Sequence, residues 1–222
     1  MAWTRTDIAN RALGILGVKE AITDVDTDTS REAKAIRAVL DIAIESIASE
    51  FDWPYTRRKE EMTLIDGSAS EAYNNDWQYA YQYSTYWVKF FRVQQADGGD
   101  RNPTDESKIP YEIISYSSGR LILTDQEDAS ADVAVLPEEG FYPAKYIEAL
   151  AYLTAMMAGP RLEGATKKSA DLRPMYESVL SSAKATAANE SNYEMPPDTT
   201  AVRARRGNLS RRWNWRVGDP LQ

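Results

Sequence analysis

The chain contains neither cysteine nor histidine, and this bounds the chemistry of its side chains. Disulfide bridges, thiolate or imidazole metal ligands and histidine-based catalytic triads are excluded. The remaining candidates for acid–base chemistry are two pairs of adjacent carboxylates, Glu60 with Glu61 and Glu138 with Glu139. Neighbouring residues in a strand point to opposite faces, so we interpret these pairs as surface acids and expect neither an enzyme nor a cofactor.

Three aspartates alternate at Asp24, Asp26 and Asp28, the spacing with which a calcium loop begins. The match then fails, because the sixth position is Thr29 where such loops need glycine and the twelfth is Ala35 where they need glutamate. The segment is therefore interpreted as an acidic loop that favours the N-terminus of the next helix, and no metal site is predicted.

Aromatic residues occupy every second position of one run, at Trp77, Tyr79, Tyr81 and Tyr83. Aromatic side chains on one face of a sheet stack on single-stranded nucleic acids in some proteins. The run contains no Lys or Arg to follow the phosphates, so a core or subunit contact is favoured over base stacking.

The C-terminal segment is the most unusual part of the sequence. Residues 201–222 hold six arginines and one aspartate, a local charge of +5 in a chain whose formal charge is −8. Such a tail could dock on a partner, bind DNA through phosphates and stacking, or serve as a solubilising end without fixed structure. Two tryptophans are hard to justify on a solvated end, which favours docking. The predicted docking residues are Arg203, Arg205, Arg206, Arg211, Arg212, Trp213, Trp215 and Arg216.

Two helices are expected in the first quarter of the chain. Thr4 could cap the first and Gly17 end it. Thr29 and Glu32 have the spacing of a capping box, which predicts a second helix over residues 30–51 with an apolar stripe.

The period then changes from helical to that of strands. Alternation and β-branched residues predict an antiparallel region over residues 55–136, including a hairpin with Ser117, Ser118 and Gly119 at its turn. Helical spacing returns at Pro143, a good first-turn residue, and continues as far as Gly159. A fourth helix follows with Pro174 at its start or at a kink.

Together these elements predict an α+β fold that is mainly α. It is a bundle of about four helices with an inserted antiparallel β lobe and an extended C-terminal arm. The expected boundaries place the first half of the bundle at 1–55, the β lobe at 56–137, the second half at 138–190 and the basic, aromatic arm at 191–222. The segment before Gly17 has no uninterrupted apolar core, and no stretch reaches the roughly 18 apolar residues that span a bilayer, so neither a signal peptide nor a membrane contact is expected.

Several blocks, in this order and spacing, resemble the head-to-tail adaptor proteins of podovirus-type phages, often called tail tubular protein A. The resemblance spans roughly residues 6–190 and departs from the family at Ser84, where proline is expected. The blocks comprise Asn10, Arg11, Ala12, Leu13, Gly14, Ile15, Leu16 and Gly17; Ala33, Ala35 and Leu40; Phe51, Asp52, Trp53 and Pro54; Trp77, Tyr79, Ala80 and Tyr81; Phe91, Arg92 and Val93; and Phe141, Pro143, Glu148, Ala149, Leu150, Ala151, Leu153 and Thr154.

The resemblance implies a structural protein of the virion neck. Its partners would be further copies of itself in a twelvefold ring, the portal protein and the tail nozzle protein, and DNA would cross the ring without specific binding. The alternative is a DNA-binding virion or regulatory protein that acts through the arginine- and tryptophan-containing tail.

Overall fold

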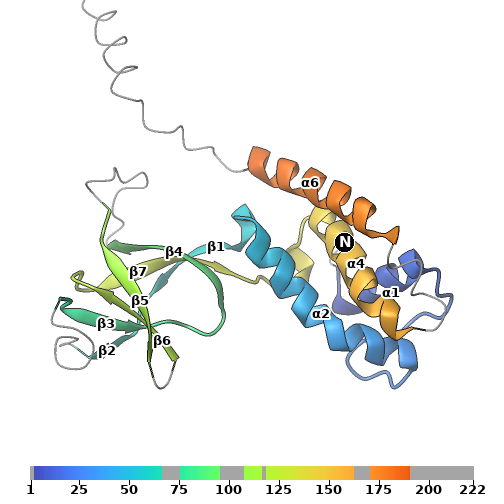
Figure 1. Cartoon of the computed structure of the whole chain (residues 1–222), viewed down its shortest axis with the longest axis horizontal. Coiled ribbons are helices and arrows are strands. Elements are labelled where there is room, and N and C mark those ends of the chain that lie inside the picture. Colours follow the sequence, from blue (N-terminus) through green and yellow to red (C-terminus); the bar gives the residue numbers. More distant parts are fainter. Residues whose placement is uncertain (1–2, 67–75, 96–107, 117–118, 163–170, 191–222) are drawn as a thin grey trace, which may run out of the picture.

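A computed structural model of the chain describes residues 3–66, 76–95, 108–116, 119–162 and 171–190. Within these residues the chain forms four α-helices and two antiparallel sheets, so the expected α+β class is confirmed. Figure 1 shows the helices together at one end of the molecule and the strands at the other. All described strands come from the sequence between the second and third of these helices.

Helix α1 (Arg5–Leu16) has the ends that its sequence predicts. Thr4 is the N-cap, and its hydroxyl accepts a hydrogen bond from the Asp7 amide at 3.2 Å. The Asp7 carboxylate accepts one in return from the Thr4 amide at 3.0 Å, which completes a capping box. Gly17 ends the helix with a left-handed backbone at φ 76°, a conformation that favours glycine.

Helix α2 (Arg31–Glu50) begins one residue later than predicted. The capping box of Thr29 and Glu32 is wrong, because Ser30 is the N-cap and its hydroxyl accepts a hydrogen bond from the Ala33 amide at 3.3 Å. Thr29 and Ser30 both have a hydroxyl that suits an N-cap, and the path of the preceding loop decides which of them occupies that position. The helix ends before residue 51, where the backbone becomes extended.

The third described helix, α4 (Ala144–Ala158), lies between the other three and contacts each of them. Pro143 precedes the first turn as the N-cap residue, so its predicted place inside that turn is wrong by one position. A short 3₁₀ turn, η3 (Gly159–Arg161), continues α4 past its predicted stop. Helix α6 (Arg173–Glu190) has Pro174 in its first turn, where the missing amide removes no helical hydrogen bond.

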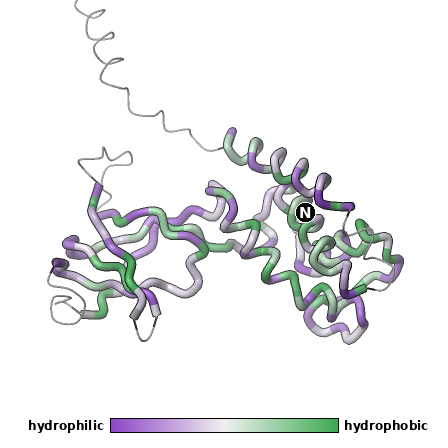
Figure 2. Tube along the Cα trace, in the orientation of Figure 1, coloured by the Kyte–Doolittle hydropathy of each residue, from purple (hydrophilic) through white to green (hydrophobic). Residues whose placement is uncertain are grey.

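One apolar core joins these helices. It contains fully buried side chains from α1, α2 and α4, among them Leu13, Ile36, Leu40 and Leu150, and α6 adds small residues such as Ala183. Figure 2 shows hydrophobic positions recurring along the helices, between hydrophilic ones. Helices from before and after the strands therefore bury one another's apolar stripes, because neither pair has enough apolar area alone.

A three-stranded sheet lies nearer the helices, with the strand order β1-β7-β4. Its strands are β1 (Arg57–Glu61), which follows the 3₁₀ turn η1 (Pro54–Thr56), β4 (Trp87–Gln95) and β7 (Ala129–Val135). All seven residues of β7 are buried, as expected of a central strand.

A four-stranded sheet follows the order β2-β3-β6-β5. Its strands are β2 (Leu64–Asp66), β3 (Tyr79–Gln82), β5 (Tyr111–Tyr116) and β6 (Gly119–Thr124). The predicted hairpin is present, because β5 and β6 pair from the Tyr111–Thr124 pair to the Tyr116–Gly119 pair. A second core, which includes Tyr81, Ile122 and Val133, lies between the two sheets.

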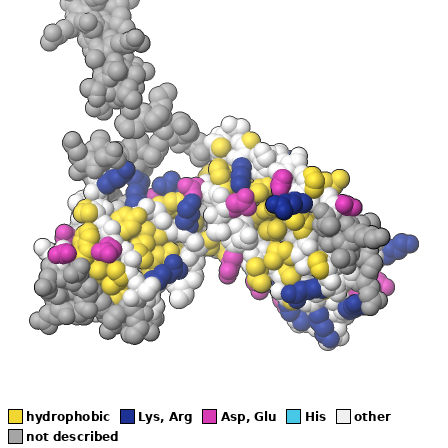
Figure 3. Space-filling view, in the orientation of Figure 1, with side chains coloured by type: hydrophobic (Ala, Val, Ile, Leu, Met, Phe, Trp, Pro, Cys, Tyr) yellow, Lys and Arg dark blue, Asp and Glu magenta, His cyan; other side chains and the backbone are white. Residues whose placement is uncertain are grey.

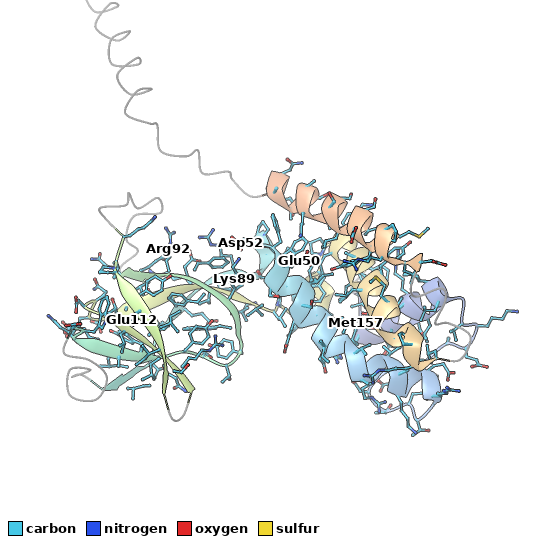
Figure 4. The ribbon with its side chains drawn as sticks, in the orientation of Figure 1. Glu50, Asp52, Lys89, Arg92, Glu112 and Met157 are labelled. Atoms are coloured by element: carbon cyan, nitrogen blue, oxygen red, sulfur yellow. The ribbon has the colours of Figure 1, made fainter. Side chains whose placement is uncertain are left out.

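Aromatic residues fill the junction between the helices and the strands. The Trp53 ring meets that of Tyr146 edge to face at 5.1 Å, and its indole N–H donates to the Ile47 carbonyl at 2.8 Å. That carbonyl lies in the last turn of α2, where it lacks a helical partner, so Trp53 also caps the helix. Lys89 of β4 adds an ion pair with Asp52 at the same boundary (Figure 4).

Candidate functional site

The predicted docking residues of the tail, from Arg203 to Arg216, lie outside the described residues. The structure therefore bears on the surfaces that could receive such a tail. Two properties identify a receiving surface for a basic, aromatic segment: unpaired acidic side chains and exposed apolar groups. One region of the four-stranded sheet has both.

Strand β5 is an edge of that sheet, and the directions of its backbone groups follow from its pairing with β6. The Arg120 carbonyl of β6 accepts a hydrogen bond from the Tyr83 amide at 3.0 Å, so Arg120 turns its backbone groups away from β5. Arg120 pairs with Ser115, and alternate residues of an antiparallel strand face opposite sides. Ser115, Ile113 and Tyr111 therefore direct their amides and carbonyls to the side of β5 that has no paired strand among the described residues.

Large apolar side chains are exposed along this edge. Tyr111 is 37% exposed and Ile113 is 41% exposed. Both lie on the face of the sheet that carries buried Ile122, because Ile113 and Ile122 are register partners. The Tyr111 ring meets Phe90 edge to face at 5.0 Å, which fixes its position beside the inter-sheet core. The apolar core thus reaches solvent at the open side of β5.

Acidic side chains lie near the neighbouring starts of β3 and β5. The Glu112 carboxylate accepts a hydrogen bond from the Trp77 indole at 3.1 Å, and Asp125 accepts one from the Gln78 amide at 3.1 Å. Thr124 pairs with Tyr79 on one side and with Tyr111 on the other, so the turn after it lies beside both strands. The exposed carboxylates of this acidic end are Asp76, Glu112, Asp125, Glu127 and Asp128.

The acidic end has an excess of negative charge. Within the described part of the chain none of its five carboxylates forms an ion pair with Lys or Arg. Partial burial and the negative charge of Glu127 raise the pKa of the Tyr79 phenol. Figure 3 shows carboxylates at the end of the strand part away from the helices, next to hydrophobic side chains, and Figure 4 labels Glu112 there. The surface therefore suits a cationic partner with apolar anchors.

The predicted aromatic stripe is only partly present. Tyr79, Tyr81 and Tyr83 face the core between the sheets. Trp77 packs with Ala80 on the opposite face, so its predicted place in a continuous four-residue stripe is wrong. The reason is that β3 begins at Tyr79, and the strand alternation does not extend back to Trp77. Since Tyr81 and Tyr83 are buried, this face offers no stacking platform for bases.

The acidic loop uses its carboxylates locally. Asp24 accepts hydrogen bonds from the Asp26 amide at 2.9 Å and the Thr27 hydroxyl at 2.8 Å, and Asp28 accepts one from the Ser30 amide at 2.8 Å. These bonds lower the pKa of both carboxyls. No group of three or more potential metal-ligating side chains occurs among the residues that the structure describes. The aspartates shape the turn before α2.

The two pairs of adjacent carboxylates have separate surroundings. Glu60 accepts hydrogen bonds from the Tyr86 hydroxyl at 2.6 Å and from the Trp87 indole at 2.7 Å. Glu139 pairs with Arg5 at 3.3 Å. Glu61 and Glu138 are exposed. Neither pair converges on a common point.

Sequence reasoning missed both the open edge of β5 and the acidic end. The alternation of residues 111–116 indicates a strand but not that the strand lies at an edge. The five acids are spread over residues 76–128, and their convergence depends on the order of the strands.

No known family model matches the chain, and a search of curated proteins finds no similar sequence. Among the described residues, no helix is long and apolar enough to cross a membrane.

Proposed function

We propose that the chain is a structural protein of the virion neck, a ring-forming head-to-tail adaptor that connects the portal to the tail nozzle. The observation that carries this proposal is the ordered series of sequence blocks that resemble the podovirus-type adaptors, from residues 10–17 to Thr154. In this proposal the four helices act as one bundle, the strands between them form an inserted lobe, and the C-terminal arm attaches each subunit to its neighbours or to the portal.

The positions of the blocks in the fold support the proposal. Asn10 anchors the acidic loop, because its amide group donates to the Ile22 carbonyl at 2.9 Å and accepts from the Ile22 amide at 2.8 Å. Trp53 joins α2 to α4, and Asp52 pairs with Lys89 of the β part. The blocks thus coincide with contacts that fix the arrangement of helices and strands. A ring subunit needs this rigidity, because each of its interfaces must repeat around the ring.

The charge distribution of the chain suits a ring whose channel carries DNA. The sequence before the tail carries about −13, since the tail contributes +5 to a total of −8. An acidic channel wall repels DNA phosphates, so the genome passes without binding to the protein. The basic tail then attaches the subunit to its partners, through charge-assisted hydrogen bonds to their acidic or carbonyl groups.

The test is the mass of the purified protein alone and after mixing with a portal ring, measured by light scattering with negative-stain images of any assembly. A second ring that appears only with the portal is the expected result. A protein that stays apart from the portal at all concentrations would overturn the adaptor proposal.

The second candidate is a DNA-binding virion or regulatory protein, favoured by the six arginines and two tryptophans of residues 201–222. It predicts that DNA affinity falls linearly with salt on logarithmic axes and disappears when this segment is deleted. The adaptor proposal predicts weak DNA binding that the deletion leaves unchanged.

A further inference from the structure

The open edge of β5 has features that suit the addition of another strand. Its residues, from Tyr111 to Tyr116, contain aromatic and β-branched side chains and neither Lys nor Pro, the residues that usually protect an edge. Ile113 and Ser115 direct their backbone amides and carbonyls away from β6. A segment with alternating side chains could add to this edge through main-chain hydrogen bonds and fill the exposed apolar positions.

The tail contains a segment with that alternation. In residues 212–217, Trp213, Trp215 and Val217 alternate with Arg212, Asn214 and Arg216. A strand with this sequence would have tryptophans and valine on one face and arginines on the other.

The two faces match the two faces of β5. Tyr111 and Ile113 are exposed on one face of the sheet, where tryptophan side chains would extend the apolar core. Glu112 points to the other face, where the arginines of the incoming strand would lie beside its exposed carboxylate. The +5 tail and the five acids of the acidic end are thus complementary in charge.

From these observations we infer that residues 212–217 of a neighbouring copy of this chain add as a strand to the open edge of β5. The inference rests on the proposed ring, because a neighbour must be present. The segment 191–211 spans up to about 70 Å when extended, which is ample reach to an adjacent subunit. Each subunit both gives and receives a strand, so the contact is heterologous and is compatible with a closed ring.

Disulfide trapping tests this inference cleanly, because the chain has no cysteine of its own. In a parallel addition that sets Trp213 beside Tyr111, Val217 lies beside Ser115, so the double variant Ser115→Cys, Val217→Cys places its thiols at neighbouring positions on the same face. In the antiparallel register Val217 lies beside Tyr111, so Tyr111→Cys, Val217→Cys is tested alongside it. It is oxidised with diamide, both free at high concentration and after assembly on the portal ring. The expected result is a ladder of cross-linked multimers on a denaturing gel. As a matched control, Thr186→Cys on the exposed surface of α6 replaces Ser115→Cys and should give no ladder.

A second substitution separates strand addition from general proximity. Ile113→Pro, added to the cysteine pair, removes an amide that makes no bond to β6, so circular dichroism and Tm should stay as in the parent while the ladder disappears. Ile113→Val keeps the amide and should keep the ladder.

The outcomes distinguish this inference from the adaptor function. Assembly on the portal without cross-linking of either cysteine pair, cross-linking only within one chain, or a ladder that survives Ile113→Pro would each overturn strand addition and leave the adaptor standing. A ladder in the free protein together with failure to bind the portal would support strand addition and remove the adaptor.

Discussion

At the scale of single residues, Asp132 is the charged side chain on which the three-stranded sheet most depends. Its carboxylate is 8% exposed and lies between arginines of both neighbouring strands. Arg57 approaches it with two nitrogens, the shorter contact being 2.7 Å, and Arg92 contacts it at 3.2 Å. A nearly buried carboxylate is stable only with such partners, because its desolvation is otherwise uncompensated.

Asp132→Asn should therefore destabilise the protein by about 3 kcal/mol, since it leaves two arginines facing a neutral amide. Urea unfolding followed by circular dichroism measures the change. Glu61→Gln, on the exposed surface of β1, is the control and should change stability by less than about 0.5 kcal/mol. Equal effects of the two substitutions would show that Asp132 contributes nothing beyond an ordinary surface charge.

At the scale of elements, each helix depends on how its first turn is satisfied. In α1 the Thr4 hydroxyl and the Asp7 carboxylate exchange hydrogen bonds with each other's amides. The hydrogen bonds from the Thr4 side chain and backbone lower the pKa of Asp7. A carboxyl with a lowered pKa in the folded state stabilises the fold above its unfolded pKa, near 3.9, and the effect is lost as the pH falls through the folded value.

Thr4→Ala should cost about 1 kcal/mol at neutral pH, because an amide of the first turn loses its acceptor. Asp7→Asn should be less stable than the parent at pH 6, and the difference should shrink as the pH falls through the folded pKa of the Asp7 carboxyl. Thermal melts over this range give both values. Glu20→Gln, in the exposed loop after α1, serves as the control and should not reproduce the pH dependence. A pH-independent effect of Asp7→Asn would contradict the capping role.

At the scale of the whole molecule, both connections between the helices and the strands pass one cluster of tyrosines. Tyr55 enters the strand region, Tyr142 leaves it, and Tyr146 belongs to α4. The rings of Tyr55 and Tyr146 lie 5.4 Å apart, and those of Tyr142 and Tyr146 lie 4.9 Å apart. Burial raises the pKa of all three phenols, that of Tyr142 to about 12. The junction is therefore stable only while these phenols are neutral.

The protein should unfold cooperatively in alkali. Phenols in the unfolded chain ionise near pH 10, so the stabilisation is complete below that pH and is lost as the pH rises through the folded values. Absorbance at the phenolate band, followed together with circular dichroism, should show buried tyrosines ionising as the helices melt.

The double substitution Tyr55→Phe, Tyr146→Phe should move this alkaline transition to higher pH. Neither hydroxyl has a hydrogen-bond partner among the described atoms, so stability at neutral pH should change little. Tyr86→Phe, at an exposed phenol, is the control and should leave the transition in place. An unchanged transition in the double variant would exclude the cluster as its cause.

The sequence by itself determined what depends on neighbours along the chain. The cap of α1, its end at Gly17 and the hairpin of β5 and β6 follow from residues a few positions apart, which meet however the rest folds. The composition likewise pointed to the tail as a docking segment, a prediction that concerns residues outside the described part of the chain.

Only the tertiary structure decided what depends on distant partners. Trp77 lies outside the predicted stripe because it packs against Ala80 and Leu123 on the opposite face of the sheet. The acidic end and the open side of β5 exist because β6 pairs with both β3 and β5, which brings residues 76–128 together. The order in which strands pair is fixed by the packing of the whole core. The periodicity of a single strand does not indicate which strands lie beside it.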